Sequence, residues 1–370
     1  MRASPNPVGN GPVTPAPDPL QPEFTPVRAD RWEHGSGFHL SLDIGEARYP
    51  WSDHPHAYWG SGRDALRSLI GWGHGDGRWS RVLCPSFYCP EAVVAIRQEA
   101  DVAVYPDAPM MPGDGVLAAG PRDVALVVSL YGRRPAIRVT GAAIILEDHS
   151  HDPVSGWART SQADYAFASL RKTLPLPDGG VLWSPRGLDL PREREMTKAH
   201  EAAVLDRLSA MVLKRLYLSG SAVAKDDFRN LAARGEAQIA DGGISGMSPF
   251  SRARIGSFPV DAWRKARAAN LEAFRTALGD LPGVAVLDAP FAATLIFDRP
   301  SRREEVRRTL IEARIYPAIL WSLDELAIEG IPADHVRLGR RVLSLHCDQR
   351  YGPEDMIRVA EHVRKAMGGR

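Results

Sequence analysis

The chain has 370 residues, with 46 lysines and arginines against 45 aspartates and glutamates, which leaves a net charge of +1. This length can form one large domain with a sizeable core, or one large and one smaller domain. The balanced charge argues against a nucleic-acid or membrane-surface partner. The three cysteines form no CxxC pair, which argues against a disulfide framework or a four-thiolate zinc site and favours a reducing cytoplasm.

No apolar run approaches the roughly 20 residues that a membrane span needs, and no secretory leader is evident behind the first arginine. We therefore expect a soluble protein. Eight prolines fall between Pro5 and Pro26, mixed with Gly, Ala and Thr. This composition is typical of a disordered lead, which we place at residues 1–31.

Strand-like and helix-like segments alternate through the first half of the remaining chain, which predicts an α/β layer with a mostly parallel sheet. Helices are predicted at 63–73 and 90–100 from apolar residues at helical spacing. Short apolar strands, rich in β-branched residues, are predicted at 81–88, 101–106, 123–131, 142–148 and 163–170.

The second half turns helical and charged, with amphipathic patterns at 192–218 and 261–278 separated by a Gly/Ser-rich patch. Strand and helix patterns then alternate to the end, which predicts a compact α+β tail. We expect a large α/β domain at 32–250 and a small C-terminal α+β domain at 251–370.

The first candidate site is the segment EDHSHD at 147–152, directly after an apolar strand. Polar residues at the carboxyl end of a buried parallel strand lie where α/β proteins bind ligands. His149 and His151 could ligate a metal, because an H-x-H pair on an extended segment points both rings the same way. Asp148 could instead hydrogen-bond a protonated ring nitrogen of a cofactor, or the segment could be a polar turn that ends the strand.

The second candidate is the segment WGSGRDAL at 59–66, where a Gly-Ser-Gly turn leads into a helix at Gly62. The unpaired backbone N–H groups and the dipole of such a helix start favour an anion, for which a phosphate is the natural choice. A simple turn without a ligand is the alternative.

The third candidate is Lys172 in the segment ASLRKTLPLPDGG at 168–180. Pro175 and Pro177 resist helix formation, and Gly179 and Gly180 allow a tight approach or turn, which makes this a rigid loop. Lys172 is therefore either a solvated loop charge or an amine held in one place. Taken together, an anion-binding helix start, a strand-end aspartate and a loop lysine, in this order, are what a pyridoxal phosphate (PLP) site needs.

At these residues the sequence resembles the fold-type I PLP-dependent aminotransferases, and more narrowly the DegT-like sugar aminotransferases. The resemblance runs from about Tyr58 to Met367. It rests on SGRDAL as a phosphate loop, PSFYCPEAV as a strand and helix that supply an aromatic over the ring, IILEDHSHD as the acidic strand end, and ASLRKTLPLPDGG as the lysine loop.

The resemblance implies PLP as cofactor and a transfer of an amino group between an amino donor and a keto or sugar-like acceptor. It implies that Lys172 forms the internal aldimine and that Asp148 binds the pyridine nitrogen. It further implies cofactor contacts from Gly62, Arg63, Asp64, Tyr88, His151 and Ser169: the first three through backbone N–H groups to the phosphate, Tyr88 over the ring, His151 at the phenolic oxygen and Ser169 through its hydroxyl. A homodimer is implied as well.

The sequence departs from the sugar-processing members at Phe167, which stands where they carry a serine. This difference leaves a nucleotide-sugar substrate open. A substrate carboxylate would need an arginine, for which the sequence offers Arg252, Arg254, Arg340, Arg341 and Arg350. Trp321 could line the substrate pocket or belong to the core.

Two further functions stay open at this point. The same lysine and aspartate would serve another PLP-dependent carbanion reaction, such as that of a decarboxylase or lyase. A metal-dependent hydrolase built on His149 and His151 is the alternative from a different class; the PLP hypothesis itself assigns no metal ligand.

Overall fold

The computed structural model describes residues 27–111, 115–141, 144–324 and 328–368. Most of the predicted N-terminal lead therefore lies outside the described residues. Within the described ranges, no helix is both long enough and apolar enough to cross a membrane.

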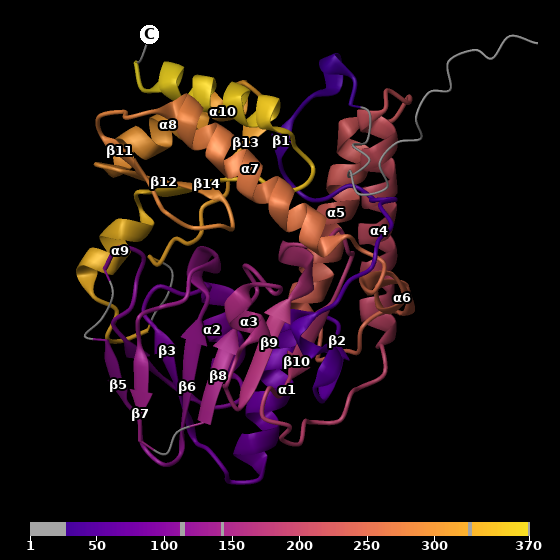
Figure 1. The fold of residues 1–370 in the computed structure, drawn as a ribbon. Coiled ribbons are helices and arrows are strands. Elements are labelled where there is room, and N and C mark those ends of the chain that lie inside the picture. Colours follow the sequence, from indigo (N-terminus) through magenta and orange to yellow (C-terminus); the bar gives the residue numbers. More distant parts are fainter. Residues whose placement is uncertain (1–26, 112–114, 142–143, 325–327, 369–370) are drawn as a thin grey trace, which may run out of the picture.

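A seven-stranded sheet forms the centre of the larger part of the molecule, in the order β2-β10-β9-β8-β6-β3-β4 (Figure 1). Every pairing in it is parallel except the two made by β10. The strands are β2 (His56–Trp59), β3 (Arg81–Pro85), β4 (Asp101–Tyr105), β6 (Asp123–Val128), β8 (Ile144–Asp148), β9 (Tyr165–Ser169) and β10 (Gly180–Trp183). The predicted mostly parallel α/β sheet is confirmed.

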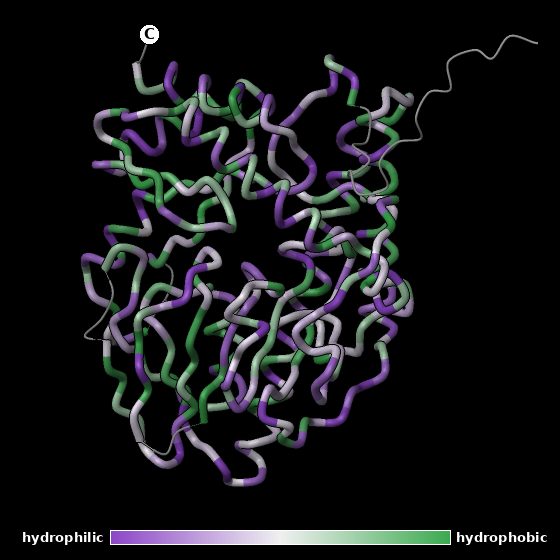
Figure 2. Tube along the Cα trace, in the orientation of Figure 1, coloured by the Kyte–Doolittle hydropathy of each residue, from purple (hydrophilic) through white to green (hydrophobic). Residues whose placement is uncertain are grey.

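Hydrophobic residues are concentrated along the central strands (Figure 2), and all six residues of β6 are buried. Strands that are covered on both faces need such continuous apolar runs. Helices α1 (Gly62–Gly75) and α2 (Pro90–Arg97) form where the sequence pattern predicts them and bury their apolar faces in the same core. The short elements α3 (Gly156–Arg159), β5 (Val116–Ala118) and β7 (Arg138–Thr140) complete this part.

The C-terminal part is built on an antiparallel sheet in the order β11-β12-β14, made of Val284–Val286, Ala293–Phe297 and Val342–Leu345. Helices α7 (Val260–Leu278), α8 (Pro300–Glu312) and α10 (Pro353–Ala366) share one apolar core with this sheet. The shorter α6 (Pro249–Ile255) and α9 (Ala333–Gly339) lie near the large sheet's core. The predicted α+β tail is confirmed.

The segment before the large sheet packs on the C-terminal part. β1 (His34–Gly35) pairs in parallel with β13 (Ile315–Tyr316), although nearly the whole chain lies between them. The sequence prediction assigned these early residues to the large domain, and the domain boundaries stay a prediction.

Two long helices, α4 (Lys198–Leu218) and α5 (Lys225–Asp241), pack against each other beside the sheet (Figure 1). Their contact buries Ala210, Tyr217 and Phe228. The amphipathic pattern predicts α4, but α5 is not predicted as a separate helix. Its last turns reach the edge of the sheet where the candidate residues lie.

Candidate active site

The carboxyl ends of the parallel strands bring the three candidate segments together. β2 leads into α1, β8 ends at Asp148, and β9 ends three residues before Lys172. β10 runs the other way, so its first residue, Gly180, lies opposite both Trp59 of β2 and Ser169 of β9. The start of α1 and the lysine loop are therefore neighbours across one strand.

Two glycines allow this close approach. A Cβ atom on Gly62 would lie 2.7 Å from Ser169 Cβ, and one on Gly180 would lie 2.2 Å from the Ser61 carbonyl oxygen. Side chains cannot be accommodated at such distances. The Gly-Gly pair behind the lysine thus allows the loop to lie against the helix start, as the sequence analysis expects.

The start of α1 is capped by Ser61, whose Oγ accepts the backbone N–H of Asp64 over 3.1 Å. This N–H is therefore engaged within the helix, and Asp64 does not line the pocket described below. The expected contribution of the Asp64 N–H to phosphate binding stays a prediction. The buried carboxyl of Asp64 packs inside, where burial raises its pKa to about 6.

Asp148 is buried at the end of β8, and both of its oxygens are held. Oδ1 accepts the backbone N–H of Ser150 over 2.8 Å, and Oδ2 accepts the hydroxyl of Tyr88 over 2.7 Å. Burial and the neighbouring carboxylate of Asp148 raise the pKa of Tyr88 well above its usual value. Tyr88 therefore stays a hydrogen-bond donor, and the aspartate is fixed in one orientation.

Lys172 is the last residue of a short 3-10 helix, Leu170–Lys172, that follows β9. Its Nζ lies 5.4 Å from the centre of the Trp321 ring. Among the described residues, no carboxylate lies within ion-pair distance of this amine. The amine is thus held beside an aromatic ring without a counter-ion.

A pocket of about 280 Å³ opens where these elements meet; we call it the strand-end pocket. Six of the predicted site residues line it: Gly62, Arg63, Tyr88, Asp148, Ser169 and Lys172. Arg171 and Glu236 line it as well, the latter from α5. The pocket therefore brings together six of the eight predicted site residues, and their roles stay predictions.

No protein-family model and no curated protein matches the sequence. Solved structures do match the fold. DesI, solved in the presence of its TDP-sugar product, has a TM-score of 0.56 at 19% identity, covering 84% of this chain and 80% of that chain. Spr1654 from Streptococcus pneumoniae in its PMP form has a TM-score of 0.54 at 12% identity, covering 86% and 87%.

The aminotransferase PseC of Helicobacter pylori, involved in the biosynthesis of pseudoaminic acid, has a TM-score of 0.53 at 10% identity, covering 85% of this chain and 86% of that chain. The chain has an aminotransferase fold. The fold class predicted from the sequence, a fold-type I architecture with a large α/β sheet and a small α+β part, is therefore confirmed.

In this aminotransferase fold, His151 lies beside the strand-end pocket rather than in its lining. Its ring is stacked between Phe291 and Trp321, with centroid distances of 4.2 and 5.5 Å. Its Nδ1 accepts the backbone N–H of Tyr131 over 2.9 Å, while its Nε2 is buried without a partner among the described residues.

Burial, and after it the positive charges of Lys172 and Arg267, hold the pKa of His151 well below its usual value. The ring is therefore neutral at pH 7. Because Nδ1 is an acceptor, the contacts assign the proton to Nε2. His151 thus presents a buried N–H donor without an acceptor.

The aminotransferase fold does not bring His149 to the same place. Residues 149–152 form a turn rather than an extended segment, so the expectation that both rings point the same way is wrong. His149 contacts Trp157 and Trp183, and its Nε2 bonds Glu147 over 2.9 Å. Within the described ranges, no group of three or more His, Cys, Asp or Glu residues could hold a metal ion. The geometric basis of the hydrolase hypothesis is absent.

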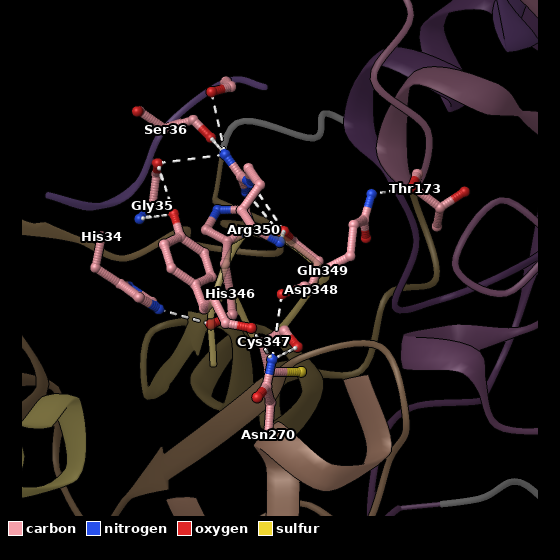
Figure 3. A network of polar contacts seen from close by, with 12 residues as sticks. His34, Gly35, Ser36, Thr173, Asn270, His346, Cys347, Asp348, Gln349 and Arg350 are labelled. Atoms are coloured by element: carbon pink, nitrogen blue, oxygen red, sulfur yellow. Dashed lines mark hydrogen bonds and ion pairs between the residues drawn. The ribbon is translucent and has the colours of Figure 1, made fainter. Parts of the chain in front are cut away.

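The five arginines proposed for a substrate carboxylate have other acceptors. Arg350 is representative: it binds Asp348 over 2.8 Å and the carbonyl of Ser36 over 2.8 Å (Figure 3). Arg340 pairs with Asp324. Arg252 binds Glu193, Arg254 binds the carbonyl of Asp43, and Arg341 binds the carbonyl of Arg337.

Two arginines in or near the site are not identified by the sequence analysis: Arg171, which is half-buried and lines the strand-end pocket, and Arg267, which is buried beside it. Arg171 directly precedes Lys172, and this position is the only indication in the sequence that Arg171 belongs to the site. Arg267 is buried on α7 with its Nε lacking a partner among the described residues. Arg267 lines a small cavity together with Thr173 and Gln349. The side-chain amide of Gln349 points toward the Thr173 carbonyl (Figure 3). Nothing in the local sequence distinguishes Arg267 from the other arginines of its helix.

Proposed function

We propose that the chain is a PLP-dependent aminotransferase that moves an amino group between an amino donor and a keto or sugar-like acceptor. One observation carries the proposal: Lys172, Asp148 and the start of α1 open onto the same pocket. The fold supports it, since Spr1654 has been solved in both PLP and PMP forms. These neighbours also support the proposal that the chain is a divergent DegT-like aminotransferase.

The polar groups of the pocket fit PLP. The close approach of α1 to Ser169, which Gly62 permits, leaves the N–H groups of Gly62 and Arg63 and the Ser169 hydroxyl beside one another as a phosphate cradle. The unpaired Nε2–H of His151 is a donor suited to the phenolic oxygen. Asp148 is the acceptor for the ring nitrogen, and Tyr88 borders the ring.

When bound, PLP accepts the electrons released as a bond to the substrate's reacting carbon breaks. Lys172 would hold the cofactor through Nζ, and the same Nζ, as a free amine, would take the proton from the substrate's reacting carbon and deliver it to the cofactor's carbon that carries the amino group. Tyr88 and Ser150 both donate to Asp148, so its carboxyl is held in one orientation, in which it would face the ring nitrogen. Trp321 covers Lys172 and limits the access of water.

We further infer, from the resemblance, that the protein acts as a cytoplasmic homodimer with the large domain at 32–250 and the small domain at 251–370. A molar mass measured by light scattering tests the dimer. Limited proteolysis near residue 250, followed by mass determination of the fragments, tests the domain boundary.

An absorption spectrum tests the function. The purified protein, loaded with PLP, should show a band near ~420 nm that Lys172→Ala abolishes. Lys265→Ala, which changes an exposed lysine on α7, should keep the band. Mixing the loaded protein with amino donors such as glutamate should convert this band to that of the aminated cofactor. Release of carbon dioxide or ammonia without conversion would identify another carbanion reaction, and a colourless protein that holds zinc would refute the PLP hypothesis.

A further inference from the structure

The side chain of Arg171 lies at the wall of the strand-end pocket, next to Lys172 in the chain. Its Nη1 and Nη2 donate to the two carboxylate oxygens of Glu236 over 2.6 and 3.1 Å. Glu236 comes from α5, so the pair connects the lysine loop to the α4–α5 hairpin. A two-point contact of this kind fixes the plane of the guanidinium.

The Nε–H of Arg171 is buried and has no acceptor among the described residues. A buried guanidinium N–H normally has one, because an unsatisfied charged donor is costly. Glu236 accepts one N–H from each Nη, whereas the Nε atom makes no bond at all, so the Nε–H is the buried donor that a ligand would satisfy.

The charges around Glu236 are unbalanced. Arg207 binds the same carboxylate and is itself anchored by the Pro177 carbonyl, and Arg63 lies close enough to affect Glu236 electrostatically. Burial opposes ionisation of Glu236, but Arg171, then Arg207 and Arg63, hold its pKa at about 2. Burial lowers the pKa of Arg207 only to about 10. Three guanidinium groups surround this one carboxylate, and the carboxylates of Asp178 and Asp64 also act electrostatically on Arg171.

We propose that Arg171 binds the phosphate of the cofactor through its Nε–H, with Glu236 and Arg207 as positioning residues that hold its guanidinium in place. The inference rests on the proposed function, because it names a residue for the phosphate of PLP. A phosphate monoester carries about two negative charges at pH 7 and would be a direct anionic partner for the Arg171 guanidinium. Arg171 and the start of α1 line the same pocket, so one phosphate can contact both.

This assignment gives α5 a function in the site. The sequence analysis does not predict α5 as a separate helix, yet α5 supplies the carboxylate that orients Arg171. Glu236 alone would repel a phosphate; held between Arg171 and Arg207, it instead fixes the donor that attracts one. The Arg171–Glu236 pair also forms a wall between the strand-end pocket and a second cavity of about 870 Å³.

The test compares PLP with pyridoxal, which lacks the phosphate. Dissociation constants of both are measured by absorbance titration for the wild-type protein, Arg171→Met and a control, Arg67→Met. Arg67 lies on α1 and pairs with Glu99, and neither of these two residues lines the strand-end pocket. Arg171→Met should weaken PLP binding about tenfold or more and change pyridoxal binding less than about twofold. Arg67→Met should leave the preference for PLP unchanged.

Arg171→Lys covers the case that Arg171→Met does not fold, because it keeps a positive charge beside Glu236 and removes the Nε–H. Its preference for PLP over pyridoxal should still fall at least about threefold. An unchanged preference in a folded variant, or an equal loss for both ligands, overturns the phosphate role while the PLP-dependent function stands. A wild-type protein that binds neither ligand overturns both proposals.

Discussion

The hydroxyl of Tyr88 donates a hydrogen bond of 2.7 Å to Asp148 Oδ2, and both side chains are buried. The bond joins the segment after β3 to the end of β8, two strands that are separated in the sheet by β6. The sequence resemblance assigns Tyr88 to the face of the cofactor ring. The structure adds a second contact, in which the tyrosine orients the acid at the edge of that ring.

Replacing Tyr88 by phenylalanine should therefore destabilise the protein more than removing an ordinary hydroxyl. The change leaves a buried carboxylate with one donor fewer, which costs about 2 kcal/mol of the free energy of unfolding. The control is Tyr105→Phe, because the buried Tyr105 hydroxyl donates to a neutral acceptor, the Leu126 carbonyl, over 2.7 Å. Urea denaturation of the cofactor-free protein measures both; equal losses would contradict a special role of the bond to Asp148.

Three histidines, of which His34 is buried and His39 and His346 are half-buried, make the stability depend on pH. Burial is the largest cause that lowers the pKa of His34 and His39 to about 3 and that of His346 to about 4. In the unfolded chain the pKa of each histidine is about 6.5, so below that pH the unfolded state binds more protons than the folded state. Each histidine then loses about 1.4 kcal/mol of stabilisation per pH unit. We expect the free energy of unfolding to fall between pH 7 and pH 5.

Burial raises the pKa of Asp64 and Asp107 to about 6. As the pH falls over part of this range, these two buried carboxyls therefore increase the free energy of unfolding, opposite to the histidines. A variant isolates the histidine contribution. His34→Gln keeps a donor for the His346 carbonyl and removes the titrating ring, so its stability should decline less steeply below pH 6. The exposed His56 supplies the control, His56→Gln. Parallel curves for His34→Gln and the wild-type protein would contradict the assignment.

A methyl group at Gly180 should separate the lysine loop from the start of α1. Because the added Cβ would lie 2.2 Å from the Ser61 carbonyl, the backbone must move, which costs about 1–3 kcal/mol. Gly180→Ala should therefore lower both the melting temperature and the affinity for PLP. Gly156→Ala is the matched control, since nothing lies within 4 Å of its added Cβ. Calorimetry and a PLP titration measure the two effects, and a Gly180→Ala protein that keeps both values would show that the close approach is dispensable.

Local patterns predict the elements that carry the site. The helix at Gly62 and the strands that end at Asp148 and Ser169 form as their apolar spacing indicates, because both faces of the strands are buried in one core. Gly180 is recognisable in the sequence as a position of close approach, although its antiparallel strand is not.

Contacts between distant segments are what the sequence does not reveal. Glu236 reaches Arg171 from a helix whose charged, weakly apolar pattern carries no sign of a functional residue. The pairing of His34 with Ile315 likewise depends on a register between short strands that no local periodicity encodes. His151 lies near its predicted place, but its two stacking partners come from the other end of the chain.

The buried charge of Arg267 should matter for function and not for stability. Its Cζ lies 5.8 Å from the centre of the Phe291 ring, which stacks on His151, and no carboxylate among the described residues pairs with it. Asp348 acts on Arg267 electrostatically but is already paired with Arg350, so the desolvated guanidinium of Arg267 adds little to the stability of the folded state. Arg267→Met should therefore unfold at the same or a higher urea concentration than the wild-type protein.

We propose Arg267 as the partner of a substrate carboxylate, because its charge, like that of Lys172, acts on the buried His151 beside the strand-end pocket. With glutamate as donor, Arg267→Met should raise KM about tenfold or more, because the substrate's charge loses its partner. With an amine that lacks a carboxylate, KM should change less than about twofold. Arg275→Met, on the same helix but paired with the exposed Asp288, should behave like the wild-type protein with both donors. Equal changes of KM for both donors would show that Arg267 supports the shape of the site rather than recognising an acid.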